Sequence, residues 1–239
     1  MSPEGKQRLQ LALGLAIAVA GLRAGYILYT RHEENLATQK RTQPKNVGYA
    51  NADYYVTPKK LYPFDLKSAK QLTAQPVWVK EGYRYTYYLY DAAAKRVDFS
   101  HEGGLLGPIE KLEIKDVSIV LGPGGKRQMV AMFEKESKDY VVPIGMESDG
   151  QWKIYSDEIF YIEDPHQLYK HWPADVWQAV EQHEVKPGMN ELQADFAAGM
   201  GVPDAGASSD EKTVRYANGG KPLVVVYRGE KAAEVKVGS

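Results

Sequence analysis

The sequence predicts an α+β protein with an N-terminal transmembrane helix, a β-rich middle and a C-terminal module of two helices and three antiparallel strands. Three observations support this prediction: a long apolar stretch near the N-terminus, a central series of short strand-like runs, and paired helix signals followed by three further strand-like runs. The expected segments are residues 1–30 (membrane anchor), 31–76 (polar linker), 77–163 (β-rich domain) and 164–239 (C-terminal module).

Composition narrows the class of function. The 239 residues are 44% hydrophobic and 26% charged, which is enough apolar content for folded cores. The net charge of −1 argues against nucleic acid as a partner, because phosphate binding needs a concentrated positive surface. The chain has no cysteine, which excludes disulfides, thiolate metal sites and a cysteine nucleophile. We expect no cofactor.

The apolar stretch runs from Leu9 to Tyr29. At about 1.5 Å per residue, a helix of this length spans roughly 31 Å, the thickness of a bilayer core. Arg23 lies off centre, where its side chain can reach the nearer interface. The expected anchor residues are Leu9, Leu13, Ile17, Leu22, Tyr26 and Tyr29. The two tyrosines suit the interfacial aromatic belt, and the predicted partner is the lipid bilayer.

A cleaved signal peptide is the alternative interpretation of this stretch. Lys6 and Arg8 form a basic start, and the Ala18–Ala20 segment offers a small-residue cleavage site. Apolar character nevertheless resumes after that site, which favours the anchor. We expect a single-pass inner-membrane protein whose body faces the periplasm. Positive charges are similar on both sides of the stretch, so a cytoplasmic body stays open.

The middle of the chain changes from linker to strand character. Residues 31–76 are polar and contain several prolines, whereas the region after Val77 is rich in aromatic and β-branched residues. The expected strands are Leu112–Leu121, Gln128–Glu134, Tyr140–Ile144, Trp152–Tyr155 and Ile159–Ile162. Their short, regular spacing predicts a small antiparallel barrel or sandwich, and an SH3-like barrel would suit the size.

The C-terminal module begins with two short helices within the segment from Trp172 to Gly201. Pro187 and Gly188 form the break between them, because proline stops a helix and glycine permits the turn. Asn190 is the predicted N-cap of the second helix, and Gln193 completes the spacing of a capping box. The expected strands that follow are Thr213–Ala217, Pro222–Arg228 and Lys231–Val237.

This region resembles the BamE/SmpA-type domain. The resemblance rests on the run from Val185 to Gln193, the helix ending at Gly199, and the strands carrying Val214–Tyr216 and Val224–Tyr227. Members of that family have two helices packed on a three-stranded antiparallel sheet, and they are small envelope proteins that support assembly of outer-membrane proteins. The resemblance implies a protein-binding module in the cell envelope. The chain departs from the family in lacking the lipid-bearing N-terminal cysteine.

Tyr169, Trp172 and Trp177 form an aromatic group where the β-rich region meets the first helix. These side chains have two interpretations: they fill the seam between the two regions, or they form a hot spot for a protein partner. We keep them as candidate partner-binding residues.

Candidate chemical groups are weaker. His166 and His171 are five residues apart, which is not metal-ligand spacing on a helix, and surface or packing histidines are expected. The pairs Asp157–Glu158 and Glu163–Asp164 are expected to be solvated. The run from Ser100 to Glu102 places a hydroxyl, an imidazole and a carboxylate in sequence, whereas triads assemble in space.

The predicted function is therefore a non-enzymatic, membrane-anchored scaffold or binding subunit whose partners are other membrane or envelope proteins. Two alternatives remain. One is an envelope hydrolase using His101, His166 or His171 with nearby carboxylates, for which a cleft holding two of these histidines and an acid would be the evidence. The other is a cytoplasm-facing accessory subunit of an inner-membrane complex.

Overall fold

The structure is a computed structural model, and it describes residues 23, 53, 56–205 and 211–238. The chain divides into two compact units, residues 1–51 and residues 52–239, and all three sheets of the described residues lie in the second.

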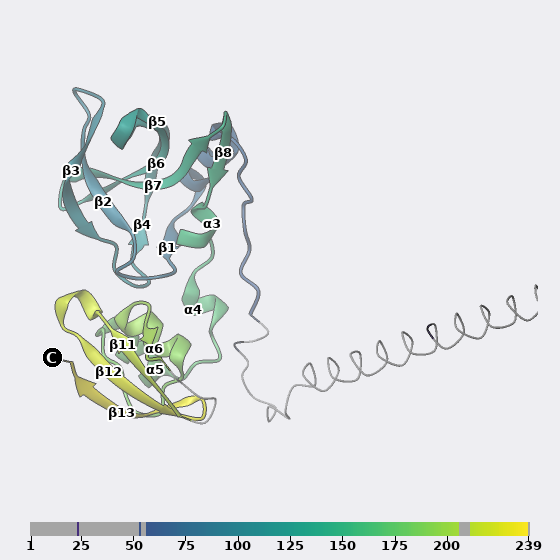
Figure 1. Cartoon of the computed structure of the whole chain (residues 1–239), viewed down its shortest axis with the longest axis vertical. Coiled ribbons are helices and arrows are strands. Elements are labelled where there is room, and N and C mark those ends of the chain that lie inside the picture. The colour runs from purple at the N-terminus through teal and green to yellow at the C-terminus, as the bar shows by residue number, and fades with distance from the viewer. Residues whose placement is uncertain (1–22, 24–52, 54–55, 206–210, 239) are drawn as a thin grey trace, which may run out of the picture. The chain divides into compact units, whose positions relative to one another are not determined.

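The largest sheet of this unit is antiparallel and six-stranded, with the order β3-β2-β7-β6-β5 and with β8 paired to β7 (Figure 1). Its strands are β2 (Thr86–Asp91), β3 (Arg96–Leu105), β5 (Ile114–Leu121), β6 (Arg127–Lys135), β7 (Lys138–Ser148) and β8 (Gln151–Ile154). The long strand β7 pairs with β2 near Tyr140 and with β8 beyond Gly145, so it changes partner along its length. Register shifts interrupt the pairing of β5 with β6 and of β6 with β7.

A second sheet has three short antiparallel strands in the order β4-β1-β9, namely β4 (Lys111–Leu112), β1 (Val77–Val79) and β9 (Phe160–Tyr161). The third sheet has the order β10-β11-β12-β13, with β10 (Val202–Pro203), β11 (Glu211–Tyr216), β12 (Leu223–Arg228) and β13 (Lys231–Val237). Helices α5 (Ala174–Glu181) and α6 (Glu191–Ala198) pack with this third sheet.

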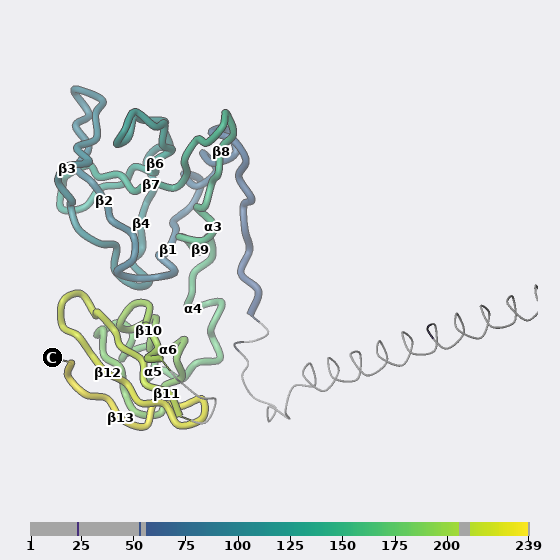
Figure 2. Tube along the Cα trace, in the orientation of Figure 1, coloured from purple at the N-terminus to yellow at the C-terminus, as the bar shows by residue number. Residues whose placement is uncertain are grey.

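Short helical segments connect these layers. They are α2 (Leu66–Ala69), η2 (Lys70–Ala74), η3 (Pro123–Gly125), α3 (Ser156–Ile159), α4 (Pro165–Leu168) and η4 (Asn218–Gly220). Figure 2 shows β9 and α4 at the junction between the β-rich part and the part containing α5 and α6. Pro165 occupies the first turn of α4, where its missing N–H leaves no bond unmade, and Asp164 caps that turn.

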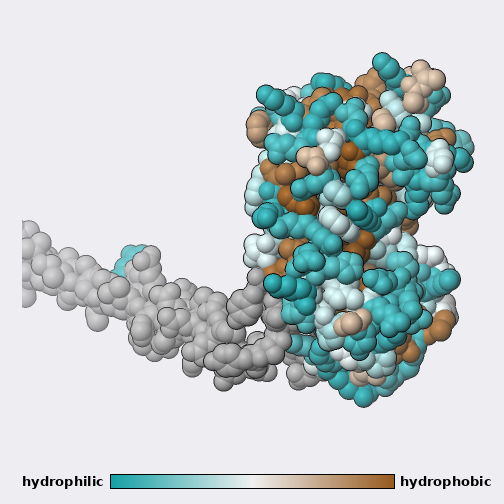
Figure 3. Space-filling model, turned by 180° about the vertical axis from the view of Figure 1, so that it is seen from behind, coloured by the Kyte–Doolittle hydropathy of each residue, from teal (hydrophilic) through white to brown (hydrophobic). Residues whose placement is uncertain are grey.

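The buried side chains form two hydrophobic cores. Core 1 lies within residues 69–160 and includes Leu72, Phe133 and Ile144; core 2 lies within residues 161–232 and includes Phe196 and Tyr216. Figure 3 shows hydrophobic side chains on the visible face of both parts and at the junction between them.

The β4-β1-β9 sheet separates the two cores and contributes to both. Val77 and Val79 of β1 belong to core 1, whereas the intervening Trp78 packs against core 2. In β9, Phe160 belongs to core 1 and Tyr161 to core 2. Because successive side chains of a strand point to opposite faces, one short sheet supplies a wall to each core.

The predicted fold class is wrong. The chain is β-rich and has three antiparallel sheets. The prediction was an α+β protein with a separate barrel or sandwich and a module of two helices on three strands. The C-terminal sheet has four strands, and the β4-β1-β9 sheet is shared between the regions expected to be separate. Short apolar runs such as β1 do not reveal in the sequence that both of their faces are buried.

Part of the range 31–76, expected to be a polar linker, belongs to the folded structure. Residues 66–74 form α2 and η2, and Ala69 and Leu72 are fully buried in core 1. Asp65 caps α2 through a capping box with Ser68, a local signal that the proline-rich surroundings obscured. Within the described residues there is no helix with the length and hydropathy to cross a membrane. The predicted anchor, including Leu9, Leu13, Ile17, Leu22, Tyr26 and Tyr29, lies outside those residues.

Candidate functional site

The three predicted partner-binding aromatics occupy different environments. Tyr169 and Trp172 are buried in core 2, with 5% and 6% of their surfaces exposed. Their ring centroids lie 4.7 Å apart, and the Trp172 ring makes an edge contact with Phe196 at 5.0 Å. Trp177 contacts Trp172 at 5.1 Å but is only partly buried. Only Trp177 therefore retains surface for a partner.

The carboxylate of Asp53 binds the polar edge of Trp172 in this aromatic group. It accepts hydrogen bonds from the indole N–H of Trp172 at 2.6 Å and from the side-chain amide of Asn190 at 2.7 Å. The His171 Nε2 atom lies 2.5 Å from the same carboxylate, whose side chain is only 8% exposed. No local sequence pattern marks Asp53, because its partners lie more than a hundred residues away.

Asn190 and Gly188 shape the connection between α5 and α6. The Asn190 side chain accepts the Gln193 N–H at 2.8 Å, and the Gln193 side chain accepts the Asn190 N–H at 2.9 Å, which is the reciprocal capping box that their spacing predicts. Gly188 has a φ of +92°, a conformation that favours glycine. Met200 lies beyond the end of α6 and is 45% exposed.

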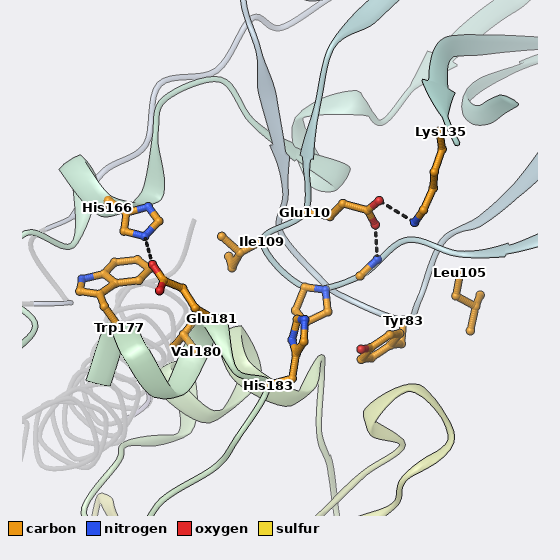
Figure 4. A pocket seen from close by; sticks show the side chains of 12 residues that line it. Tyr83, Leu105, Ile109, Glu110, Lys135, His166, Trp177, Val180, Glu181 and His183 are labelled. Carbon is orange, nitrogen blue, oxygen red and sulfur yellow. Dashed lines mark hydrogen bonds and ion pairs between the residues drawn. The ribbon is translucent and has the colours of Figure 1, made fainter. Parts of the chain in front are cut away.

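A pocket of about 480 Å³ lies between α5 and the β-rich part (Figure 4). The β-rich part contributes Tyr83, Leu105, Gly107, Pro108, Ile109, Glu110 and Lys135, and the helical part contributes His166, Trp177, Val180, Glu181 and His183. Figure 4 shows the imidazole of His166 over the Trp177 indole, across the pocket from Glu110 and Lys135. We call this the seam pocket.

Ion pairing determines the electrostatics of one wall. The Lys135 ammonium lies 2.7 Å from Glu110, whose other oxygen accepts the Gly107 N–H at 2.7 Å. Burial acts to lower the pKa of Lys135, but the hydrogen bond and the charge of Glu110 outweigh it and raise that pKa overall. Lys135 therefore stays protonated, and it lies 5.3 Å from the centre of the Tyr87 ring, within cation–π range.

The opposite wall is organised around His166. Its Nδ1 atom lies 3.0 Å from Asp164, its Nε2 atom lies 3.5 Å from Glu181, and its ring stacks on Trp177 at 4.0 Å. His183 adopts a φ of +56° just after α5, and its Nδ1 atom lies 3.1 Å from the Ala197 carbonyl. Both histidines therefore use ring nitrogens to hold neighbouring elements.

The candidate chemical groups of the sequence do not converge. His101 lies beside Asp98 at 2.9 Å on the exposed strand β3 and does not line the seam pocket. Ser100 also bonds to Asp98, so the local partner is this carboxylate and not Glu102. Of His101, His166 and His171, only His166 lines the seam pocket. The arrangement that would have indicated a hydrolase, two of these histidines with an acid in one cleft, is not what the pocket contains.

The carboxylates expected to be solvated have structural partners instead. Asp157 accepts the backbone N–H groups of Leu61 and Tyr62, and Glu163 accepts the backbone N–H of Lys59. Across the described ranges, His, Asp and Glu side chains form no group of three that could hold a metal ion.

Comparisons with protein-family models, with curated proteins and with solved structures found no match to this chain. The site therefore has to be interpreted from its own geometry. It combines the partly exposed indole of Trp177, the aliphatic side chains of Ile109 and Val180, and the paired charges of Glu110 and Lys135.

Proposed function

We propose that this chain is a non-enzymatic, membrane-anchored binding subunit of a membrane or cell-envelope assembly, and that the seam pocket is its recognition site. The observation that carries the proposal is the half-buried indole of Trp177 in a pocket where Lys135 is paired with Glu110 and His166 with Glu181.

The pocket chemistry favours binding over catalysis. Its lining includes no serine, threonine or cysteine that could act as a nucleophile. Its one lysine, Lys135, is kept protonated by the ion pair with Glu110, which removes the lone pair an amine nucleophile needs. A general base needs a free basic atom directed at the substrate, whereas both nitrogens of His166 already face carboxylates.

The pocket suits a side chain from another protein. A volume of about 480 Å³ lies within the roughly 300–1,000 Å³ of typical ligand sites. Trp177, Ile109 and Val180 offer apolar contact, and Glu181 at the edge offers a partner for a positive charge. An aromatic or aliphatic anchor side chain beside a basic residue fits these features, because partly exposed tryptophans are frequent interface hot spots.

The membrane part of the proposal rests on the apolar stretch from Leu9 to Tyr29. The BamE/SmpA-type resemblance of the C-terminal region supports a protein-binding role in the envelope. We place the chain in the inner membrane with its folded body in the periplasm.

Site-specific photocrosslinking tests this function. A photoreactive phenylalanine analogue is introduced at position 177 of the full-length chain and, as a control, at position 152. Trp152 is also a partly buried tryptophan, but it packs against core 1 beside Arg127, away from the pocket. We expect a discrete protein adduct in native membranes from position 177 only. Equal adducts at both positions, or none at 177, would overturn the assignment of the seam pocket.

A further inference from the structure

Two aromatic side chains protrude from the segment that precedes α2. Tyr62 and Phe64 are 74% and 76% exposed, and within the described residues they are the only aromatic side chains that are largely exposed. Pro63 between them is half-buried. We call Tyr62, Pro63 and Phe64 the aromatic tip.

The backbone before the tip is held by a carboxylate from α3. Asp157 accepts the N–H of Leu61 at 3.1 Å and the N–H of Tyr62 at 2.7 Å, one with each oxygen. Tyr62 itself has a φ of +49°, a conformation that costs a tyrosine energy and therefore needs outside support. The Leu61 side chain packs against core 1 and so fixes the segment before the tip to the folded body.

The backbone after the tip is equally fixed. The Phe64 N–H donates to the Ser68 hydroxyl at 3.0 Å, and Leu66 at the start of α2 packs against core 1. The tip is therefore presented by an anchored backbone, and its two rings are exposed because the local geometry directs them outward.

The charge around the tip is positive. Lys60 and Lys67 are exposed, and neither takes part in an ion pair within the described ranges. The nearby acids are already engaged: Asp157 by two backbone N–H groups, and Glu163 by the backbone and the ammonium of Lys59, each at 2.9 Å. Asp65, beside Phe64, is held by Ser68 as the cap of α2 and lies near Lys67. Lys60 and Lys67 remain exposed to bind an anionic partner.

We infer that the aromatic tip inserts into the interface of an anionic lipid bilayer, with Lys60 and Lys67 on the lipid headgroups. Aromatic rings flanked by lysines are typical of surfaces that lie in the headgroup region. A protein hot spot would instead lie within a broad apolar contact area, which the lysines beside this tip do not provide. This inference rests on the proposed membrane attachment and adds a second contact between the membrane and the folded body.

The chain between the predicted anchor and the tip is long enough for both to reach one membrane. The chain is held to the folded body at Asp53, which binds Trp172 and Asn190, so about 24 residues separate Tyr29 from that point and span at most about 85 Å when extended. The tip can therefore reach the surface from which the anchor emerges.

The test places one fluorescent label at the tip of the full-length chain. Because the natural sequence has no cysteine, Phe64→Cys creates a unique site for a polarity-sensitive dye. Leu121→Cys is the matched control, since Leu121 is 73% exposed on β5. The labelled proteins are reconstituted in phosphatidylcholine vesicles with and without phosphatidylglycerol, and some acyl chains carry bromine as a quencher.

We expect bromine to quench the dye at position 64, but not at position 121, in phosphatidylglycerol vesicles. Quenching should fall at about 1 M salt, where the screening length is about 3 Å. Each of Lys60→Gln and Lys67→Gln should weaken occupancy of the interface about fivefold, the usual contribution of one lysine near an anionic surface.

Absence of quenching at position 64, or equal quenching at both positions, would overturn the inference. A change in dye fluorescence at position 64 that requires added membrane proteins would also overturn the inference. It would show that the aromatic tip binds a protein and not lipid. Alkaline carbonate extraction of the same vesicles tests the anchor separately. If carbonate releases the chain, the proposed attachment fails, while quenching from added vesicles still reports on the tip.

Discussion

Trp78 lies directly opposite Tyr161 in the antiparallel pairing of β1 with β9, and both side chains face core 2. Their neighbours Val79 and Phe160 also pair and face core 1. This small sheet couples the packing of the two cores, because its side chains contribute to both. If the sheet unfolds, both cores become exposed to solvent.

This coupling predicts a single unfolding transition. Phe133 and Phe196 are fully buried in core 1 and core 2 respectively, so Phe133→Ala and Phe196→Ala form a matched pair. Each should lower the free energy of unfolding by about 3–5 kcal/mol. Differential scanning calorimetry should show one cooperative peak in the parent protein and in both variants. Two separated peaks, with each variant shifting only one, would contradict the coupling.

The two tryptophans of the aromatic group should differ in their contribution to stability. Trp172 is 6% exposed and donates a hydrogen bond to Asp53. Trp172→Ala should therefore lower the free energy of unfolding by about 3–5 kcal/mol or more, as is typical of a buried tryptophan. Trp177→Ala should cost less, because its ring is partly exposed at the seam pocket. Urea unfolding measures both. A larger loss for Trp177→Ala would assign that side chain to the core and weaken the proposed recognition site.

The indole hydrogen bond can be tested without changing much volume. Trp172→Phe removes the N–H that reaches Asp53 and should cost about 1–3 kcal/mol, because a buried carboxylate loses a donor. Trp152→Phe is the control, since the structure shows no hydrogen bond from that indole within the described residues. Equal losses in the two variants would show that aromatic packing, and not the bond to Asp53, is responsible.

The turn between α5 and α6 gives a further prediction. Gly188→Val should destabilise the protein by about 1–2 kcal/mol through its positive φ alone, because an added Cβ would meet no atom within 4 Å. Asn190→Ala should cost about 1 kcal/mol for the cap, and more through the lost bond to Asp53. Thermal melts check both. Gly107→Ala, at a glycine without a positive φ, is the control and should melt close to the parent.

Asp195 on α6 should make stability depend on pH. Burial raises its pKa to about 7 from 3.8, outweighing the hydrogen bond from the Gly201 N–H at 3.3 Å. The folded state therefore holds a proton that the unfolded state releases, so stability falls as pH rises from about 4 to about 7. At about 1.4 kcal/mol per pKa unit, the loss is on the order of 4 kcal/mol.

Asp195→Asn should remove this decline, because the amide does not titrate. Melting temperatures of parent and variant, measured across pH 4 to 7, provide the comparison. Carboxylates with lowered pKa, such as Glu163, act in the opposite direction and lose stability on acidification; they are common to both proteins and cancel in the difference. Parallel pH curves would contradict the assignment.

The anchor prediction is checked on the mature protein. Apolar character that continues past Ala20 to Tyr29 predicts that residues 9–29 are retained. Intact-mass spectrometry should find those residues and show that the chain stays with membranes after alkaline carbonate treatment. A mature chain that begins at Gly21 would establish cleavage of a signal peptide.

Local signals in the sequence predicted several elements of the fold. The strand Lys231–Val237 has the bounds predicted, since Gly229 marks the hairpin turn before it. The capping box of Asn190 and Gln193 is likewise a short-range interaction, complete within four residues. Such features depend on neighbours in the chain, so the order of the residues is sufficient to indicate them.

The conformation of other segments could not be predicted from neighbouring residues alone. The run Ile159–Ile162 was predicted to be a strand, but Ile159 ends α3 and the strand β9 comprises only Phe160 and Tyr161. Their pairing with β1, about eighty residues earlier, and the burial of both faces decided the conformation there. An apolar run of four residues satisfies a strand or a helix equally well until a partner is chosen.

The sequence by itself determined the capping box of Asn190 with Gln193, the turn at Gly188 and the hairpin before Lys231, because these follow from local propensity. The tertiary structure decided which aromatics are buried, which carboxylates hold backbone N–H groups, and which side chains meet in the seam pocket. Asp53 with Trp172 and Asp157 with Tyr62 are contacts across 119 and 95 residues. The physical reason is that such contacts depend on packing between distant segments, and a single sequence carries no local pattern that records them.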